Sequence, residues 1–200
     1  MAALTLSASR RRNVKPTTSV LHVFVEDVDC TDATFNSTPE DGQFVVVQGK
    51  TAIHSSTAGA TDKFHDGTDT NIQDVNGPNL RMVWGSAQRS DRSALGQQRV
   101  PVFKKGAVRV KTKLFNVAND GTTLAGNGYV AGALLSVGNA LSAVEGAAAA
   151  DRLCLEPMAN SDFGWAVGYV ERVVTDSVVA GRGEIEVYLY DSPKYVSQRA

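Results

Sequence analysis

Histidines and the acids near them are the residues of this chain whose types best suit acid–base or metal chemistry. The three histidines are His22, His54 and His65. No two of them have the spacing at which neighbouring histidines bind one metal ion. His65 and the acids that follow it, Asp66, Asp69 and Asp74, form one group in a predicted loop. Carboxylates suit a hard cation, but this group lacks the regular spacing and the closing glutamate of a calcium loop. We therefore interpret it as a solvated polar loop, and His22 as a structural residue in a strand.

The glycines between residues 126 and 132 come closest to a nucleotide-binding motif. Their pattern is Gly126-x-Gly128-x-x-x-Gly132, with Glu145 further along the chain. A dinucleotide site needs a buried strand directly before the glycines and a long helix after them. Residues 119–123 (NDGTT) are instead a turn signal, so we expect these glycines to lie in a β-turn. Because no G-x-S-x-G, H-E-x-x-H or P-loop sequence occurs either, we expect neither an enzyme nor a bound cofactor or metal.

Cysteine use and the N-terminal sequence predict synthesis inside a cell. Cys30 and Cys154 are far apart and outside any C-x-x-C spacing, so we expect buried thiols and not a disulfide framework. The N-terminal arginines follow a short, weakly apolar stretch, which is the reverse of the order in a secretory signal. The chain also lacks an apolar run of about 18 residues, so we expect no membrane span.

Charge is segregated along the chain although its formal net charge is only −1. Residues 1–19 hold four bases and no acid, and residues 26–41 hold six acids and no base. Residues 81–113 hold nine bases against one acid, and from residue 120 onward ten acids face five bases. Such segregation suits a protein that docks through complementary patches, on copies of itself or on a larger charged assembly.

We expect two sets of residues to make these intermolecular contacts. The cationic set is Arg10, Arg11, Arg12, Lys15, Arg81, Arg89, Arg92, Arg99, Lys104 and Lys105. The acidic set is Glu26, Asp27, Asp29, Asp32, Glu40 and Asp41. Within the cationic region, Trp84 and Phe103 have rings that could stack on nucleic-acid bases. The pI of about 6.3 is not that of a dedicated nucleic-acid-binding protein, so we do not expect direct binding to nucleic acid.

The elements that must position these residues are β-strands separated by polar turns. Residues 1–19 are expected to form an extended basic arm, in which Pro16 prevents a continuous helix. The strands expected in the first half of the chain are 20–28, 44–47 and 80–84. Residues 48–79 are rich in Thr, Ser, Gly, Asn and Asp, which is typical of a long polar loop.

Two later stretches alternate strictly between apolar and charged side chains. The first, 106–115, has a row of cations on one face: Arg109, Lys111 and Lys113. The second, 183–191, has on one face Glu184 and Glu186. If these strands are neighbours, the two rows form a ladder of cross-strand charge pairs, each worth about 0.2–1 kcal/mol. Such a ladder would fix the register of the strands more than it would stabilise the fold.

Further short apolar runs complete a pattern that predicts a β-rich protein. These runs are 129–137, 153–155 and 165–174, and Gly and Asn or Asp turns separate them. The Ala-rich residues 141–152 allow one short helix. We therefore predict an all-β fold, a β-barrel or β-sandwich, with an extended N-terminal arm, a long polar loop and at most one short helix. Residues 20–200 would be one β-rich domain, or an arm- and loop-rich part (20–100) followed by a small β-barrel (101–192).

The order of patterns from about residue 105 to residue 191 resembles that of a class of viral protein. A strand with a cation row and an aromatic LF pair precedes a polar glycine turn, then GYVAGALLSVG, VGYVERVV and a closing GEIEVYLY strand. This order resembles the small β-barrel domains of tailed-phage virion proteins, especially the capsid decoration (cement) proteins. The resemblance covers a little under half of the chain. It implies a protein without catalytic residues that oligomerises, often as a trimer, and clamps neighbouring capsomers together.

The leading hypothesis is a structural virion protein that decorates and stabilises a tailed-phage capsid. An oligomeric β-domain and the N-terminal arm would bridge neighbouring capsomers, and the partners would be the major capsid protein and other copies of this chain, with a trimer favoured. The protein would be made in the host cytoplasm and end on the capsid surface. One alternative is a tail-tube or head-completion ring protein. A further alternative is a carbohydrate-binding β-sandwich, and its candidate stacking residues are Trp84, Trp165, Tyr188 and Tyr190.

Overall fold

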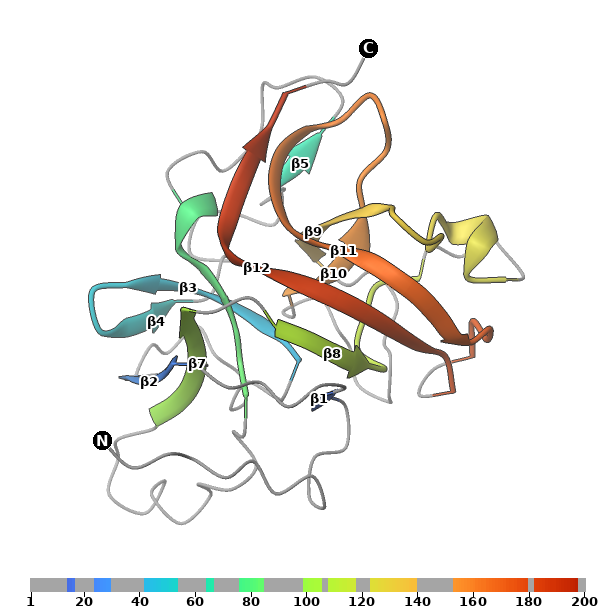
Figure 1. Cartoon of the computed structure of the whole chain (residues 1–200). Helices are drawn as coiled ribbons and strands as arrows, with labels where there is room; N and C mark the ends of the chain where they lie inside the picture. The colour runs from blue at the N-terminus through green and yellow to red at the C-terminus, as the bar shows by residue number, and fades with distance from the viewer. Residues whose placement is uncertain are drawn as a thin grey trace.

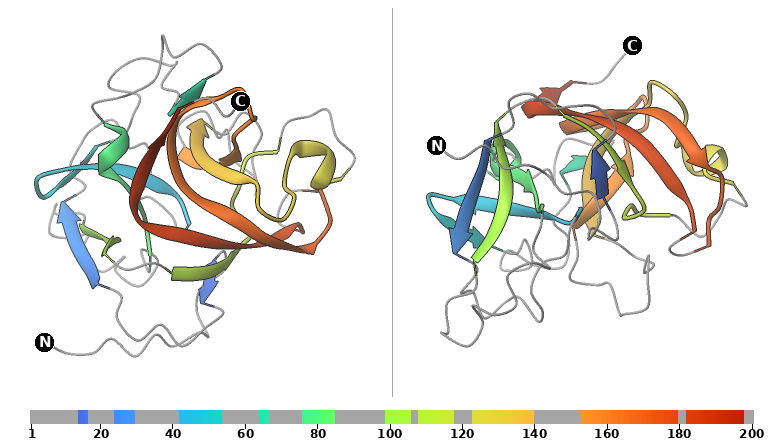
Figure 2. Two further views of the ribbon diagram at one scale, coloured as in Figure 1. Left: turned by 45° about the horizontal axis from the view of Figure 1, so that its top comes forward. Right: turned by 60° about the horizontal axis from the view of Figure 1, so that its bottom comes forward.

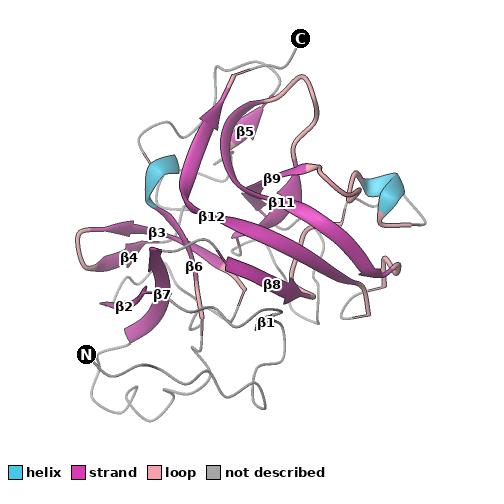
Figure 3. Cartoon of the chain, viewed as in Figure 1, coloured by secondary structure: helices cyan, strands magenta, loops and turns pink. Residues whose placement is uncertain are grey.

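The computed structural model describes ten segments of the chain, most of whose residues lie in β-strands (Figures 1 and 3). The described residues are 14–16, 24–29, 42–53, 64–66, 76–84, 99–105, 108–117, 123–139, 153–179 and 182–197. The helices within these segments are two single 3₁₀ turns, η3 (Gly77–Asn79) and η6 (Ala125–Asn127). The predicted all-β class is thereby confirmed. No helix of the described segments is long and apolar enough to cross a membrane.

The twelve strands of these segments belong to one continuous sheet. In the first half of the chain they are β1 (Val14–Pro16), β2 (Phe24–Asp29), β3 (Phe44–Gln48), β4 (Thr51–Ile53), β5 (His65–Asp66), β6 (Leu80–Met82) and β7 (Arg99–Lys105). In the second half they are β8 (Val108–Thr112), β9 (Leu134–Asn139), β10 (Leu153–Pro157), β11 (Phe163–Thr175) and β12 (Glu184–Val196). The order across the sheet is β1-β8-β12-β11-β9-β10-β3-β4-β2-β7, with β5 beside β11 and β6 beside β3.

Five strands of the first half pair in a closed circle, which we call the first ring. β3 pairs with β4 and with β6, β4 pairs with β2, and β2 pairs with β7. An isolated bridge from Val83, directly after β6, to Val102 of β7 closes the circle. The ring has its own small apolar interior: Val28, Val45, Ala52, Val83, Val100 and Val102. In Figure 1 the hairpin of β3 and β4 marks this ring on the left of the molecule.

The strands of the second half form a larger circle, the second ring. Its neighbours are β8, β12, β11, β9 and β10 in that order. An isolated parallel bridge between Phe115, just after β8, and Leu155 of β10 completes it. The views in Figure 2 show β11 and β12 curling around β9. The interior of this ring is continuous with the main apolar core of the molecule.

β3 and β7 of the first ring separate its interior from the main core, and the sequence of β3 reflects this position. Val45 points into the first ring, whereas Phe44 and Val46 belong to the main core. Consecutive residues of β7 likewise point to opposite sides, because Val102 lies in the interior of the first ring and Phe103 in the main core. A strand that is buried on both faces needs an uninterrupted apolar run, and FVVV supplies it in β3.

The hairpin of β11 and β12 supplies the longest wall of the second ring, with thirteen residues in each strand. Between Ala166 and Gly168 of β11, the partner in β12 jumps from Lys194 to Leu189. Pro193 lies among the residues of β12 that this jump leaves out of the pairing with β11. Proline has no N–H group to donate to a strand ladder. This irregularity lies where β12 changes direction in Figure 1.

The structure also shows where the predicted elements differ. β9 begins only at Leu134, because η6 and the following turn occupy residues 125–133. The predicted polar loop 48–79 contains β4, β5 and η3. Three residues of the predicted arm, Val14–Pro16, lie as an edge strand beside β8. The other arm residues, Cys30 and the predicted helix 141–152 lie outside the described residues.

Candidate functional site

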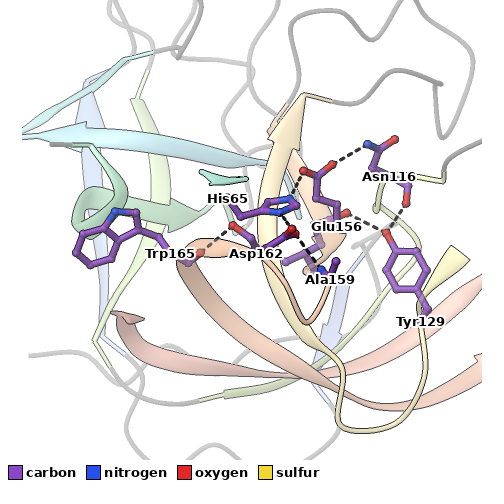
Figure 4. Close-up of polar contacts among 9 residues, drawn as sticks. His65, Asn116, Tyr129, Glu156, Ala159, Asp162 and Trp165 are labelled. Carbon is purple, nitrogen blue, oxygen red and sulfur yellow. Dashed lines mark hydrogen bonds and ion pairs between the residues drawn. The ribbon is translucent and has the colours of Figure 1, made fainter. Parts of the chain in front are cut away.

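One partly buried cluster of ionisable side chains stands out among the described residues, and we call it the His65 clamp. It consists of His65 on β5, Glu156 on β10 and Asp162 in the turn before β11 (Figure 4). The His65 Nδ1 atom lies 2.7 Å from Asp162 Oδ2, and Nε2 contacts Glu156 Oε1. The side chains of His65 and Asp162 are each 13 % exposed, and that of Glu156 is 21 % exposed. The imidazole is therefore held between two carboxylates, one at each ring nitrogen.

Two glycines make room for the clamp. Gly164 pairs with His65 across β11 and β5 at φ +141°, and a Cβ atom there would lie 2.2 Å from the Phe64 carbonyl oxygen. Gly138 lies on β9 beneath Glu156, and a Cβ atom there would lie 2.1 Å from Glu156 Oε1. Both contacts are far shorter than van der Waals distances. Any side chain at either position would therefore displace a part of the clamp.

A second layer of hydrogen bonds orients the two carboxylates. The side-chain amide of Asn116 donates to Glu156 Oε2 at 2.9 Å, and the backbone N–H of Ala159 donates to Asp162 Oδ2 at 2.9 Å. The hydroxyl of Tyr129 lies within hydrogen-bond reach of the carbonyl oxygens of Asn116 and Leu155. Tyr129 is fully buried, so its hydroxyl ties the backbone of Asn116 to that of Leu155, the residue before Glu156.

The electrostatics of the clamp favour a protonated imidazole. Burial lowers the pKa of His65, but the hydrogen bond to Glu156 and the charge of Glu156, followed by those of Asp162, outweigh it, so that the pKa lies above its ordinary value of 6.5. Burial raises the pKa of Tyr129 well above its ordinary value, and the nearby charge of Glu156 adds to this effect. Tyr129 therefore stays neutral beside the cluster.

The clamp has the residue types of an acid–base site but not the arrangement of one. A general base needs a ring nitrogen within reach of a substrate, whereas both nitrogens of His65 face carboxylates. The hydrogen bonds that the described residues make to the two carboxylates come from Asn116 and from the Ala159 backbone, and not from a serine or threonine nucleophile. The geometry instead joins β5 to the segment that runs from β10 to the start of β11, through a histidine that contacts two carboxylates.

A surface pocket of about 430 Å³ adjoins one side of the clamp. Asp162 and Asn160 are its polar lining residues, and the rest of its wall comes mainly from residues 128–134 and Met158. Neither His65 nor Glu156 lines it. The pocket therefore does not bring a ligand to the imidazole.

A second candidate site is the outer surface of the second ring, formed by β8, β12 and β11, which we call the outer face. Its members are Arg109, Tyr169, Glu171, Arg172, Glu186, Tyr188, Tyr190 and Lys194. Tyr169 and Tyr188 stack with ring centroids 5.2 Å apart, and Tyr190 lies 6.3 Å from Tyr188. The ammonium group of Lys194 lies 4.4 Å from the centre of the Tyr190 ring.

Ion pairs bind the three strands of the outer face to one another. Strands β8 and β12 are neighbours, as the ladder hypothesis required, and Glu186 lies opposite Lys111. The resolved ion pair of Glu186 is with Arg172 on β11, at 2.6 Å, and Arg109 pairs with Glu171 at 2.8 Å. The ladder thus extends over three strands and leaves guanidinium groups and tyrosines at the surface.

Some residues expected to make intermolecular contacts form bonds within the chain. Arg99 of β7 pairs with Asp29 of β2 at 2.7 Å, and these residues lie opposite each other in the sheet. Arg81 donates to the carbonyl oxygens of Pro78 and Leu80, and burial lowers its pKa. The Arg99–Asp29 ion pair thus joins β7 to β2 in the first ring, and the Arg81 guanidinium is bonded to the backbone of η3 and β6.

The remaining residues of the predicted contact sets are only partly placed. Lys15, Lys104 and Lys105 lie in β1 and β7, and Glu26 and Asp27 lie in β2. The residues of these sets that lie outside the described segments are Arg10, Arg11, Arg12, Arg89, Arg92, Asp32, Glu40 and Asp41.

The aromatic residues considered for carbohydrate stacking have unequal exposure. Trp84 is only 2 % exposed and packs against Phe103, so it offers no ring face to a ligand. Trp165 lies against Gly77, and Tyr195 packs edge-on against its ring. Tyr188 and Tyr190 are half-buried within the tyrosine group of the outer face. Cys154 is a buried thiol that is not part of a disulfide, as predicted.

Comparisons of the chain with protein-family models, with curated proteins and with solved structures found no match. The chemistry of the two sites therefore rests on their geometry alone.

Sequence reasoning placed His65 in a solvated polar loop, which is wrong, because His65 lies in β5 with its side chain only 13 % exposed. It also missed the partners of His65. Glu156 and Asp162 lie 91 and 97 residues further along the chain, and neither stands in a motif. One signal was present: His65 and Phe64 interrupt a polar stretch in which few other residues could be buried. That signal identifies a contact with the core but not the strands that make it.

Proposed function

We propose that this chain is a structural virion protein that decorates a tailed-phage capsid and stabilises it by bridging neighbouring capsomers. The observation that carries the proposal is the outer face, where three tyrosines, two arginines and a lysine gather on one side of a rigid sheet. Tyrosine and arginine are the residues most enriched where proteins bind one another, because both bury large areas and still form hydrogen bonds. The chain pattern from residue 105 to residue 191 supports the same proposal through its resemblance to decoration proteins.

The edge strand β1 supports a role for the arm in assembly. Val14 pairs with Thr112, and Pro16 pairs with Val110, so a part of the arm already lies as an added strand on β8. Addition of an extended segment to a sheet edge is a common way for one chain to join another. In this proposal the arm adds to a sheet, and the outer face meets the neighbouring capsomer or a second copy.

The test is binding of the purified protein to undecorated capsid shells. We expect saturable binding that weakens with salt, and we expect Lys194→Glu or Tyr190→Ala in the outer face to weaken it at least tenfold. Lys50→Glu makes the same charge change on the exposed β3–β4 turn and should leave binding unchanged. Absence of binding by the wild-type protein at every salt concentration would refute the proposal. Stacked hexameric rings in micrographs of the isolated protein would favour the tail-tube alternative instead.

A further inference from the structure

Within the described residues, the polar contacts that attach β5 to the sheet are a short ladder, one backbone hydrogen bond beside it and the His65 clamp. β5 has two residues, and it pairs with β11 only through Phe163 with Asp66 and Gly164 with His65. The backbone N–H of Trp165 donates to the Phe64 carbonyl oxygen at 2.8 Å. The Phe64 side chain is fully buried in the main core. A two-residue strand is too short to be held by its ladder alone, so the clamp supplies much of the polar attachment.

The clamp is complete only when the imidazole carries both of its protons. A carboxylate can accept a hydrogen bond but cannot donate one, so both ring nitrogens must donate. The imidazolium has two N–H groups and a positive charge between the two negative ones. The neutral ring has one N–H group, and its other nitrogen then turns a lone pair toward a carboxylate. Loss of one proton therefore replaces a hydrogen-bonded ion pair with a repulsive contact.

We propose that the His65 clamp is a proton-operated latch, which holds β5 on β11 while His65 is an imidazolium and releases β5 when the ring loses one proton. Release withdraws Phe64 from the core and leaves the Trp165 N–H group at the edge of β11 without its partner. The rest of the sheet keeps its pairings, because β5 lies beside β11 and outside the main strand order.

The groups around the imidazole fix the direction of the pH dependence. Glu156 faces it from β10 and Asp162 from the turn before β11, whereas Asn116 and Tyr129 are neutral. Among the described residues, no other cation contacts the two carboxylates. Because the pKa of His65 is raised in the folded protein, the latch makes its full contribution to the stability of the folded state below pH 6.5. Its contribution is lost as the pH rises through the raised pKa of the folded state.

The experiment follows β5 through its neighbour Trp165 in the full chain. In a Trp84→Phe background, Trp165 is the one remaining tryptophan. Its fluorescence is recorded as the pH is raised from about 6, together with the NMR titration of the His65 ring. We expect a one-proton change in fluorescence that coincides with the titration of His65, while the far-ultraviolet circular dichroism stays constant. A fluorescence change whose midpoint differs from the titration of His65 overturns the proposal.

Substitutions in the clamp distinguish a latch from a general effect of pH. Glu156→Gln keeps the shape of the side chain but removes one charge, so we expect both midpoints to move to lower pH. Glu184→Gln removes a charge elsewhere on the sheet and should move neither. His65→Gln should abolish the fluorescence change, and a change that persists in this variant contradicts the latch. If His65→Gln does not fold, the two wild-type midpoints and the Glu156→Gln shift still decide the question.

Discussion

Single residues that lack a side chain decide whether the His65 clamp can form. Gly138 allows the Glu156 carboxylate to lie directly over β9, and Gly164 allows β5 to approach β11. A buried carboxylate is costly unless it is paired and hydrogen-bonded. The close approach that these glycines permit is what brings Glu156 within reach of both His65 and Asn116.

We predict that the single substitution Gly138→Ala destabilises the protein by about 1–3 kcal/mol, because the new methyl group overlaps the Glu156 carboxylate. The measurement is urea unfolding followed by circular dichroism. Removing the carboxylate should relieve the overlap, so Glu156→Ala should cost less in the Gly138→Ala background than in the wild type. Strictly additive costs would show that the two side chains do not compete for the same space.

Individual strands of the second ring are linked by ion pairs that cross strand boundaries. Arg172 of β11 is 63 % exposed, whereas its partner Glu186 of β12 is 9 % exposed. Solvent screens a pair in which one member is so exposed, so its contribution to stability is small. The pair instead favours one register of the hairpin over those shifted by one residue.

We therefore predict a coupling free energy between Arg172 and Glu186 of only about 0.2–1 kcal/mol. A double-mutant cycle with alanine at each position, measured by urea unfolding, gives this quantity. The coupling should shrink when the salt concentration is raised, because part of the pair is open to solvent. A coupling of about 2 kcal/mol or more that is independent of salt would mean that the pair is effectively buried.

Strands with a strong local pattern could be predicted from the sequence, whereas the ring closures could not. The alternation of Arg109 and Lys111 with valines identified β8, and that of Glu184 and Glu186 identified the first part of β12. Their charges made it a possibility, and not a prediction, that the two strands are neighbours, as they are in the structure. The first ring closes through a single bridge at Val83 and a single β2–β4 pair, which leave no periodic signal. The clamp was missed for a similar reason, since its partners meet only after distant strands have paired.

The whole molecule has two apolar interiors on the two sides of one wall. Val45 and Phe44 are neighbours in β3, yet they belong to different interiors. A substitution in either interior therefore disturbs a strand that the other one needs. This arrangement predicts that both rings unfold together.

The prediction can be tested with the two tryptophans, and the side chain of Trp84 packs in the main core, outside the interior of the first ring. Trp84 lies next to the bridge that closes the first ring, and Trp165 lies in β11 of the second. We expect the Trp84→Phe and Trp165→Phe variants each to unfold in urea in one transition. The free energy of unfolding should depend on urea concentration with the same slope in both variants, once the different midpoints that the substitutions cause are taken into account. Val45→Ala, which opens a cavity in the first ring, should lower the free energy of unfolding by about 1–3 kcal/mol in both backgrounds. Two separate transitions would show that the rings are independent units.

The central place of β12 in the second ring has a consequence for synthesis on the ribosome. β12 lies between β8 and β11, yet among the described strands it is the last to be made. Until it emerges, β8 lacks that neighbour, and the apolar side of β3 that carries Phe44 and Val46 faces an unfinished core. A ribosome that stalls before residue 184 would thus present unpaired strand edges and exposed apolar surface, the two features that drive aggregation of nascent chains. Emergence of residues 184–196 is then the step that gives β8 and β11 their shared neighbour and covers these surfaces.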